Sequence, residues 1–322
     1  MHFLLTGATG FIGSAVAESI LNQGHKLTVL VRNTSNTLSC KVEQKLYNLE
    51  NLEGLCLKMS SNVDCLIHIA ARAYVTDENS LNPLNEYLRI NRDATLNLAK
   101  IATKHGIKRF VYLSSIKVNG EQTLSDTVFK PDDIFSSSDP YGISKYEAEQ
   151  ALLKLALETE MELVIIRPPL VYGPKVKGNF AALTSLVKRG IPLPFGMINN
   201  KRSFIALDNL VHFILLCSDR TRSPKAANRV FLISDGEDVS TSTLLRKIYK
   251  AYCIKSRLLP MPISLMLFLA KVLGKSHLFD RLSGNLQVDT SLAYDLLGWK
   301  PIITMDEQLK KMAEFEKEGK NT

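Results

Sequence analysis

The sequence predicts an α/β protein in which a doubly wound parallel sheet is joined to a smaller C-terminal domain. Three observations support this fold class. Short apolar runs alternate with helical patterns from the start of the chain to about residue 170, which is typical of parallel sheets. A glycine-rich turn joins the first run to the first helix, and beyond residue 173 the alternation becomes looser. We therefore expect a first domain at 1–170, with a segment at about 205–235 returning to it, and a second domain at 171–322.

Residues 2–24 predict the first strand, turn and helix. An apolar run is followed by Gly7, Gly10 and Gly13, and apolar residues then recur at helical spacing until Gly24. A side chain in such a turn would block a phosphate from the backbone N–H groups, and the start of the helix adds free N–H donors. Because strand and helix patterns flank the turn, a dinucleotide site is favoured over an ordinary glycine-rich strand–helix turn.

The second apolar run, 27–31, ends at Arg32. In a dinucleotide fold an acid at this point would hold the adenosine ribose hydroxyls, but no Asp or Glu occurs between Glu18 and Glu43. An arginine fits a 2′-phosphate, which a carboxylate would repel. Arg32 therefore favours NADP(H); the alternative is a solvated loop arginine and NAD(H) as the cofactor.

Alternating elements continue along the chain. The third strand ends in Ala70 and Ala71, which are small enough for a cofactor to lie against the backbone. Residues 36–62 carry no clear pattern and are interpreted as a surface segment, and the tail from Glu314 as frayed. Further strands are expected at 64–71, 110–115, 162–167, 202–207 and 230–234, and helices at 84–105, 141–158, 179–189, 209–217, 240–252, 264–273 and 290–297.

Tyr141 and Lys145 form the main chemical candidate. Four residues apart on a helix, they share one face, with Cβ atoms within about 6 Å. A nearby ammonium stabilises a phenolate, so Tyr141 could exchange a proton with an alcohol oxygen that Ser115, at the end of a strand, would hold. The alternative is an exposed ion-pairing lysine beside a packing tyrosine.

Composition narrows the function classes. The chain has 322 residues and a net charge of +8, but its basic residues form no block, which argues against nucleic-acid binding. The longest apolar stretch, 260–273, contains Lys271 and is too short for stable membrane insertion. The five cysteines form no close-spaced pair and the histidines no metal-binding pattern. We expect no metal site, no leader before the first strand, and a cytoplasmic location.

Taken together, the motifs resemble those of the extended short-chain dehydrogenases/reductases, the NAD-dependent epimerase/dehydratase family, over nearly the whole chain. The resemblance implies a Rossmann domain that binds NAD(P) and a C-terminal domain that binds a nucleotide sugar. It rests on Asn91 and on TGATGFIG at 6–13, HIAA at 68–71, YLSS at 112–115, YGISK at 141–145 and RPPLVYGP at 167–174.

Site residues follow from this resemblance. The family's catalytic triad corresponds to Ser115, Tyr141 and Lys145, and Lys145 would also hold the nicotinamide ribose. Pro168 and Leu170 would border the nicotinamide. The full set of implied cofactor-binding residues is Gly7, Gly10, Phe11, Ile12, Gly13, Arg32, Ala70, Ala71, Asn91, Lys145, Pro168 and Leu170.

A UDP-sugar is the implied substrate. Asn179 matches the family's asparagine beside the nucleotide diphosphate, and RSFIALDNL resembles the family's stretch whose arginine, here Arg202, grips a diphosphate. Arg281 is a second candidate ligand for the diphosphate. The alternative is that both arginines are ordinary surface residues.

One departure from the family selects the chemistry. Family 4,6-dehydratases have an Asp-Glu pair directly after the strand-end hydroxyl, where this chain has Ile116 and Lys117, so elimination of water is not expected. Details such as IKVNGE resemble bacterial O-antigen reductases, which favours NADPH-dependent reduction of a UDP-4-keto-6-deoxy-N-acetylhexosamine. The alternatives are a UDP-sugar 4-epimerase and a non-catalytic dinucleotide-binding sensor. Relatives commonly form homodimers through the two helices that correspond to 84–105 and 141–158.

Overall fold

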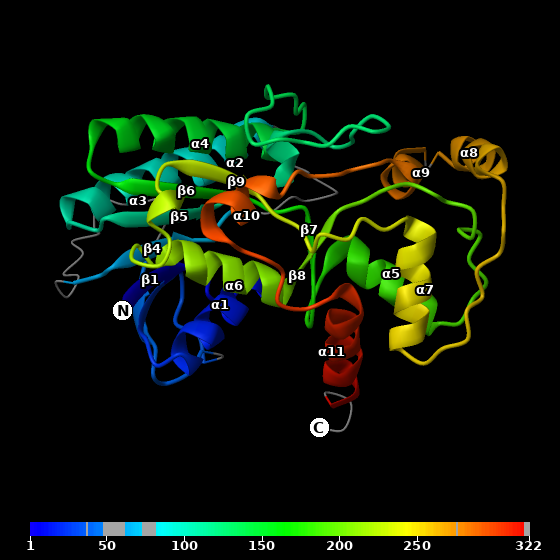
Figure 1. Ribbon diagram of the computed structural model, residues 1–322, viewed down its shortest axis with the longest axis horizontal. Coiled ribbons are helices and arrows are strands. Elements are labelled where there is room, and N and C mark those ends of the chain that lie inside the picture. Colours follow the sequence, from blue (N-terminus) through cyan, green and yellow to red (C-terminus); the bar gives the residue numbers. More distant parts are fainter. Residues whose placement is uncertain (37, 48–61, 73–81, 275, 319–322) are drawn as a thin grey trace.

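The computed structural model describes residues 1–36, 38–47, 62–72, 82–274 and 276–318. A seven-stranded parallel sheet dominates the structure, in the order β3-β2-β1-β4-β5-β6-β9 (Figure 1). This sheet and its flanking helices confirm the predicted fold class. Its strands are β1 (His2–Thr6), β2 (Lys26–Val31), β3 (Glu43–Leu46), β4 (Cys65–His68), β5 (Arg109–Leu113), β6 (Glu162–Arg167) and β9 (Arg229–Leu232).

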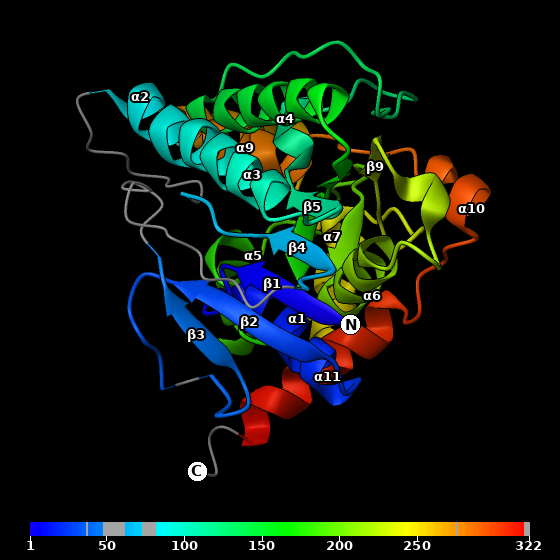
Figure 2. The ribbon, with the colours of Figure 1, turned by 90° about the vertical axis from the view of Figure 1, so that its left-hand side faces the viewer.

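Helices cover both faces of the sheet, because side chains alternate along each buried strand. In β1, Phe3 and Leu5 pack on one core, whereas Leu4 packs on the other. The first core lies under α1 (Phe11–Asn22), α6 (Leu207–Ser218) and α10 (Ser291–Leu297). The second lies under α3 (Ala94–Lys104) and α4 (Pro140–Glu158), which run together along the upper face in Figure 2.

The C-terminal elements build a smaller lobe beside the sheet, seen on the right in Figure 1. Its two-stranded parallel sheet pairs β7 (Leu170–Tyr172) with β8 (Phe204–Ala206). The chain then returns to the main sheet, where β9 pairs with β6. The lobe's helices are α5 (Gly178–Lys188), α7 (Thr241–Ala251), α8 (Ile263–Val272), α9 (Ser276–Ser283) and α11 (Met305–Glu318).

The predicted helix at 84–105 is built in three parts: α2 (Pro83–Tyr87), a π-helical turn at Leu88–Asp93, and α3. Asn91 lies in the π turn and is buried. A π turn widens the helix by one residue and occurs often at functional sites. The sequence pattern could not show this local change.

Four elements differ from the prediction. Residues 36–62 were expected to be a surface segment, but β3 lies there as a polar edge strand paired with β2. Of that range, 37 and 48–61 lie outside the described residues. Strand β7 and helix α9 were not predicted. Helix α11 was not predicted either, and it continues to Glu318 where fraying was expected, because Met305, Leu309 and Met312 recur at helical spacing and pack into the lobe core.

Candidate active site

Two cavities lie end to end between the main sheet and the smaller lobe. The first, here called the sheet cavity, has a volume of about 700 Å³ and follows the carboxyl ends of the strands. The second, called the lobe cavity, has a volume of about 660 Å³ and lies between the segment 115–122 of the main domain and elements of the smaller lobe. The residues that line both cavities are Ser115, Tyr141, Pro168 and Pro169.

Glycines form the floor of the sheet cavity because there is no room for side chains. Gly7 has a φ of +76°, and a Cβ added there would lie 2.8 Å from the Ala70 nitrogen. A Cβ on Gly13 would overlap the carbonyl oxygen of Gly7. The Thr6 hydroxyl accepts hydrogen bonds from the Ile69 and Ala70 N–H groups at 3.2 and 3.1 Å, which joins the ends of β1 and β4. The backbone is thus open to a phosphate at the start of α1.

Ten of the predicted cofactor residues line the sheet cavity, and two do not. Leu170 lines the lobe cavity instead, whereas Val171, the next residue of β7, lines the sheet cavity, because successive side chains of a strand point to opposite sides. Asn91 lines neither cavity. The ten are Gly7, Gly10, Phe11, Ile12, Gly13, Arg32, Ala70, Ala71, Lys145 and Pro168.

Asn91 lies behind the residues that line the sheet cavity and hydrogen-bonds with one of them, Arg72. Its Oδ1 accepts a hydrogen bond from the Arg72 N–H at 2.8 Å, and its Nδ2 donates to the Arg72 carbonyl at 3.2 Å. The same Nδ2 donates to Ser144 Oγ at 3.0 Å. Asn91 therefore connects the strand-end segment 70–72 to α4, and it is a positioning residue in this geometry rather than a cavity contact.

Tyr141 stands where the two cavities meet. It lies in the first turn of α4, which begins at Pro140 and is capped by Asp139, whose Oδ2 accepts from the Gly142 N–H at 3.2 Å. Burial raises the pKa of the Tyr141 phenol, and the nearby Asp139 carboxylate raises this pKa further. A hydrogen bond with Ser115 acts in the opposite direction on the pKa. The phenol therefore stays protonated near neutral pH beside the strand-end serine, which differs from the stabilised phenolate that the Tyr141–Lys145 spacing predicted, because burial outweighs the effect of the lysine.

Lys145 lies one turn further along α4 and is almost completely buried. Its Nζ donates to the Leu113 carbonyl at 2.8 Å and lies 4.5 Å from the centre of the Tyr112 ring. Burial lowers the pKa of Lys145 to about 7, although the Glu149 carboxylate favours the charged form. Arg167 holds that carboxylate through Nε at 3.0 Å. The lysine is thus no exposed ion-pairing residue, and its charge can change near neutral pH.

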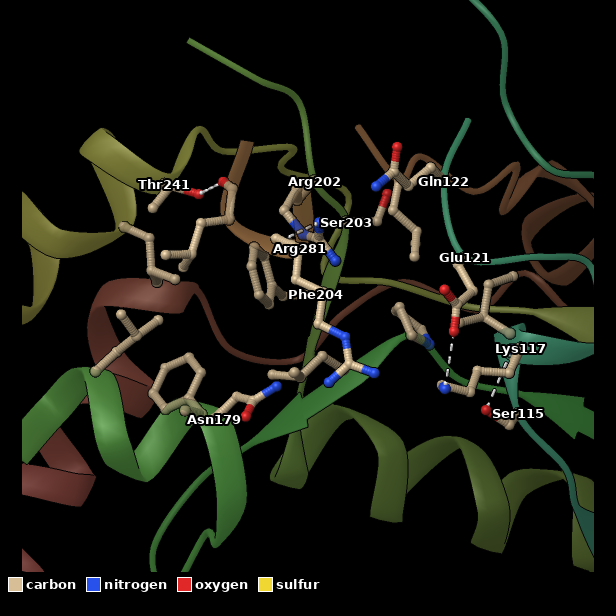
Figure 3. A pocket seen from close by; sticks show the side chains of 18 of the residues that line it. Ser115, Lys117, Glu121, Gln122, Asn179, Arg202, Ser203, Phe204, Thr241 and Arg281 are labelled. Atoms are coloured by element: carbon tan, nitrogen blue, oxygen red, sulfur yellow. Dashed lines mark hydrogen bonds and ion pairs between the residues drawn. The ribbon is translucent and has the colours of Figure 1, made fainter. Parts of the chain in front are cut away.

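The lobe cavity brings together the three predicted substrate residues. Asn179 lies in the first turn of α5, Arg281 in the last turn of α9, and Arg202 just before β8. Arg202 Nη1 donates to the Arg281 and Gly284 carbonyls at 2.9 and 3.0 Å. Figure 3 shows these side chains on one side of the cavity and Ser115 with Lys117 on the other. The arrangement offers positive charge and amide donors to an anion.

Comparison with known proteins identifies the family. The model of the NAD dependent epimerase/dehydratase family matches residues 3–233. The chain belongs to this family. A UDP-glucose 4-epimerase of Vibrio cholerae is 45% identical over 97% of this chain and 94% of its own.

Two more distant proteins are also similar to this chain. The N-acetyl-alpha-D-glucosaminyl-diphospho-ditrans,octacis-undecaprenol 4-epimerase of Escherichia coli O157:H7 is 24% identical, over 86% of this chain and 82% of its own. The structure of a UDP-glucose 4-epimerase from Thermotoga maritima with UDP-glucose superimposes with a TM-score of 0.78 over 99% of both chains, at 24% identity. At that identity the structural likeness supports the fold alone.

The position that departs from the family's dehydratases lies in the lobe cavity. Ile116 is buried, and the Lys117 ammonium donates to Glu121 Oε1 at 3.2 Å and to Asp139 Oδ2 at 3.0 Å. Glu121 and Gln122 also line the cavity, although neither was predicted as a site residue. No sequence motif identifies them, because their place in the fold depends on contacts with distant parts of the chain, such as the β-bridge from Thr123 to Asn285.

The described ranges contain no group of three or more His, Cys, Asp or Glu side chains that could hold a metal ion. His68, at the end of β4, is a core histidine. Its Nδ1 lies 2.7 Å from Thr6 Oγ1 and its Nε2 lies 2.8 Å from Thr95 Oγ1. Burial, together with the nearby charge of Lys145, lowers the pKa of His68 to about 3, so the ring is neutral.

Replacing Lys145 should change how stability depends on pH. The folded-state pKa of about 7 lies below the unfolded value of about 10.4, so between these pH values the unfolded chain binds a proton that the folded protein does not. The free energy of unfolding of the native protein should therefore rise, relative to Lys145→Met, by the order of a few kcal/mol from pH 7 to pH 10. Urea unfolding of both proteins across this range measures the difference. A pH-independent difference would contradict the assignment.

Proposed function

We propose that the protein is a UDP-sugar 4-epimerase that works with a bound nicotinamide dinucleotide. The observation that carries the proposal is the junction of the two cavities, where Tyr141 and Ser115 can reach ligands in both. In this proposal residues 1–170 bind the cofactor and residues 171–322 the nucleotide sugar. The coarser statement, that the chain is an NAD-dependent enzyme of the epimerase/dehydratase type, follows from its family.

The sheet cavity fits a dinucleotide. Its glycine floor leaves no space for a Cβ at Gly7 or Gly13, and Gly10, the residue just before α1, has no side chain that could cap the helix. The pyrophosphate would take these N–H groups, with Ala70 and Ala71 beneath the cofactor and Lys145 on the ribose. When bound, the cofactor accepts a hydride from the sugar carbon and can return it.

In this proposal the residues of this chain bind and orient the sugar and transfer the proton. The lobe cavity is within the size range of small-molecule sites. Arg202, Arg281 and Asn179 would hold the diphosphate, which places the sugar toward Ser115. Ser115 would hold the C4 oxygen, and Tyr141, as the phenolate, would take the proton of the C4 hydroxyl and return it to the C4 oxygen after the keto sugar has turned. Lys145, in its charged form, would stabilise the phenolate.

Between the two chemistries left open by the sequence, the comparisons favour the 4-epimerase over the 4-keto reductase. Two of the relatives described above are 4-epimerases by name, one of them acting on a lipid diphosphate-linked sugar. One observation favours the reductase, which would serve surface polysaccharide biosynthesis: Arg32 lines the sheet cavity where an acid would hold the ribose of NAD. We infer NAD as the working cofactor of the epimerase, and NADPH only if reduction is found.

Product analysis tests the proposal. The purified protein, supplied with NAD, should interconvert UDP-glucose and UDP-galactose or their N-acetyl forms with no net change in absorbance at the wavelength of the reduced nicotinamide. Mass spectrometry of the nucleotide released on denaturation should find NAD. Stoichiometric oxidation of NADPH by a UDP-4-keto-6-deoxy-N-acetylhexosamine, without interconversion, would instead establish the reductase.

Arg32 predicts a measurable cofactor preference. Its guanidinium can bind a 2′-phosphate, so Arg32→Asp should weaken NADP binding by about tenfold or more and leave NAD binding unchanged or stronger. Titration calorimetry with both dinucleotides measures this difference. An equal effect on the two would show that Arg32 does not contact the 2′-position.

We also propose a cytoplasmic homodimer. The support is the resemblance to the family, in which the helices corresponding to α2–α3 and α4 pair between subunits. Leu157 on α4 is 89% exposed in the single chain, as an interface residue would be. Sedimentation velocity of the native protein and of Leu157→Glu tests this assembly, since the substitution should shift the native dimer towards monomer.

A further inference from the structure

Helix α8 carries its apolar stripe on the side that faces solvent. Its Leu265, Phe268, Leu269 and Val272 recur at helical spacing and are 46%, 61%, 41% and 68% exposed. The opposite side packs through Met266 against Ile198 and Phe279 in a small core. The helix is therefore apolar on its outer side as well as on the side that packs on the protein.

The exposed apolar surface continues beyond the helix. Leu273 directly follows α8 and is 67% exposed. Leu259, before the helix, and Ile263, its first residue, are about half exposed, at 49% and 46%. Single exposed apolar residues are normal on protein surfaces, but a contiguous stripe marks an interaction site. We call the set 259, 263, 265, 268, 269, 272 and 273 the α8 stripe.

The segment that contains the α8 stripe carries basic residues and no acidic ones. No Asp or Glu occurs between Asp238 and Asp280, although the whole chain has a net charge of only +8. Lys271 on α8 and Lys255 and Arg257 before it are exposed. Among the described residues, no acidic side chain forms an ion pair with these three. The basic residues between the two acids are Arg246, Lys247, Lys250, Lys255, Arg257, Lys271 and Lys275.

We propose that the α8 stripe docks the protein on an anionic lipid bilayer surface. An apolar stripe with basic flanks is the combination that lies in the plane of a membrane interface, with apolar side chains among the acyl chains and lysines at the head groups. No helix within the described ranges is long and apolar enough to cross a bilayer. With 10 residues, α8 would lie along the surface rather than span it.

The position of α8 in the fold suits this partner better than a second copy of the chain. It lies at the opposite end of the molecule from α3 and α4, the helices proposed to form the dimer (Figure 1). A like-charged basic surface would repel a second copy of itself, whereas anionic lipids would attract it. Because Asp280, Arg281 and Leu282 of the adjoining α9 line the lobe cavity, docking would bring that cavity to the bilayer.

Vesicle binding tests the proposal on the full-length protein loaded with NAD. The protein should co-sediment with vesicles of equal parts phosphatidylglycerol and phosphatidylcholine, and much less with pure phosphatidylcholine, and high salt should weaken the binding. Phe268→Glu combined with Val272→Glu should lower the partition coefficient by about tenfold or more, since two large apolar side chains leave the interface. Lys271→Glu should lower it by about fivefold or more.

The matched control is Ile134→Glu, which places the same charge on a side chain that is 90% exposed outside the α8 stripe. It should bind vesicles like the native protein. Circular dichroism and the amount of bound NAD show whether each variant is folded, so that a folding defect is distinguished from a loss of vesicle binding. Equal binding to both vesicle types, or binding that the α8 variants do not change, would overturn the proposal. Loss of dimers in the α8 variants, with no vesicle binding by the native protein, would assign the stripe to a second copy instead.

Discussion

Replacing Tyr141 by phenylalanine should lower kcat by about 10²- to 10⁴-fold, the usual contribution of a positioned proton carrier. The ring still fills its place beside Tyr87, where the two ring centroids are 6.0 Å apart, so folding should be unaffected. The substitution removes only the hydroxyl, which hydrogen-bonds with Ser115 where the two cavities meet. Steady-state kinetics with UDP-glucose or its N-acetyl analogue measure the effect, and KM should change little because the diphosphate contacts remain.

Tyr146→Phe is the matched control for this experiment. Tyr146 lies on the same helix, stacked on Phe135 at 4.2 Å, and lines neither cavity. It should keep native activity. Bound-NAD content should be the same in both variants. If Tyr141→Phe retained full activity, the protein would bind the dinucleotide for a purpose other than the proposed proton transfer.

The second large effect is expected from Gly13→Ala. A Cβ at this position overlaps the Gly7 carbonyl oxygen, and backbone atoms cannot move aside as a flexible side chain can. The turn must open, so we expect a loss of stability of about 3 kcal/mol or more and a loss of dinucleotide affinity of about 100-fold. Urea unfolding and titration with NAD measure the two effects.

Gly24→Ala separates the turn from a general effect of glycine replacement. Gly24 lies at the other end of α1 with a φ of +75°, but an added Cβ would meet no atom within 4 Å. It should cost about 1 kcal/mol of stability, from the backbone conformation alone, and leave dinucleotide affinity unchanged. Similar losses of affinity in both variants would contradict the role assigned to Gly13.

Much of the fold could be predicted because buried parallel strands are short apolar runs between helices. The strands through Leu66, Val111 and Val164 are of this kind, and all three residues are buried. Strand β3 was not predicted because its sequence, EQKL, is polar. Its extended conformation is stabilised by backbone pairing with β2, which no local pattern shows. The π turn around Asn91 depends on contacts with 72 and 144, which no local pattern contains.

The site residues also fall into two groups, those that a local sequence motif identifies and those that only the fold brings to the site. Residues fixed by a local motif, such as the glycine turn and the Tyr141–Lys145 spacing, line the sheet cavity together. Leu170 was assigned to the cofactor but lines the other cavity, since its orientation depends on the pairing of β7 with β8. Glu121 was missed because the fold, and not its neighbours in sequence, places it near the substrate side.

The hydrogen bonds of Asn91 link the segment beside the sheet cavity to helix α4. One amide grips the backbone of Arg72, next to the sheet cavity, and the hydroxyl of Ser144, the residue immediately before Lys145. A displacement of residues 70–72 would therefore be transmitted through Asn91 to α4, the helix that carries both Lys145 and Tyr141.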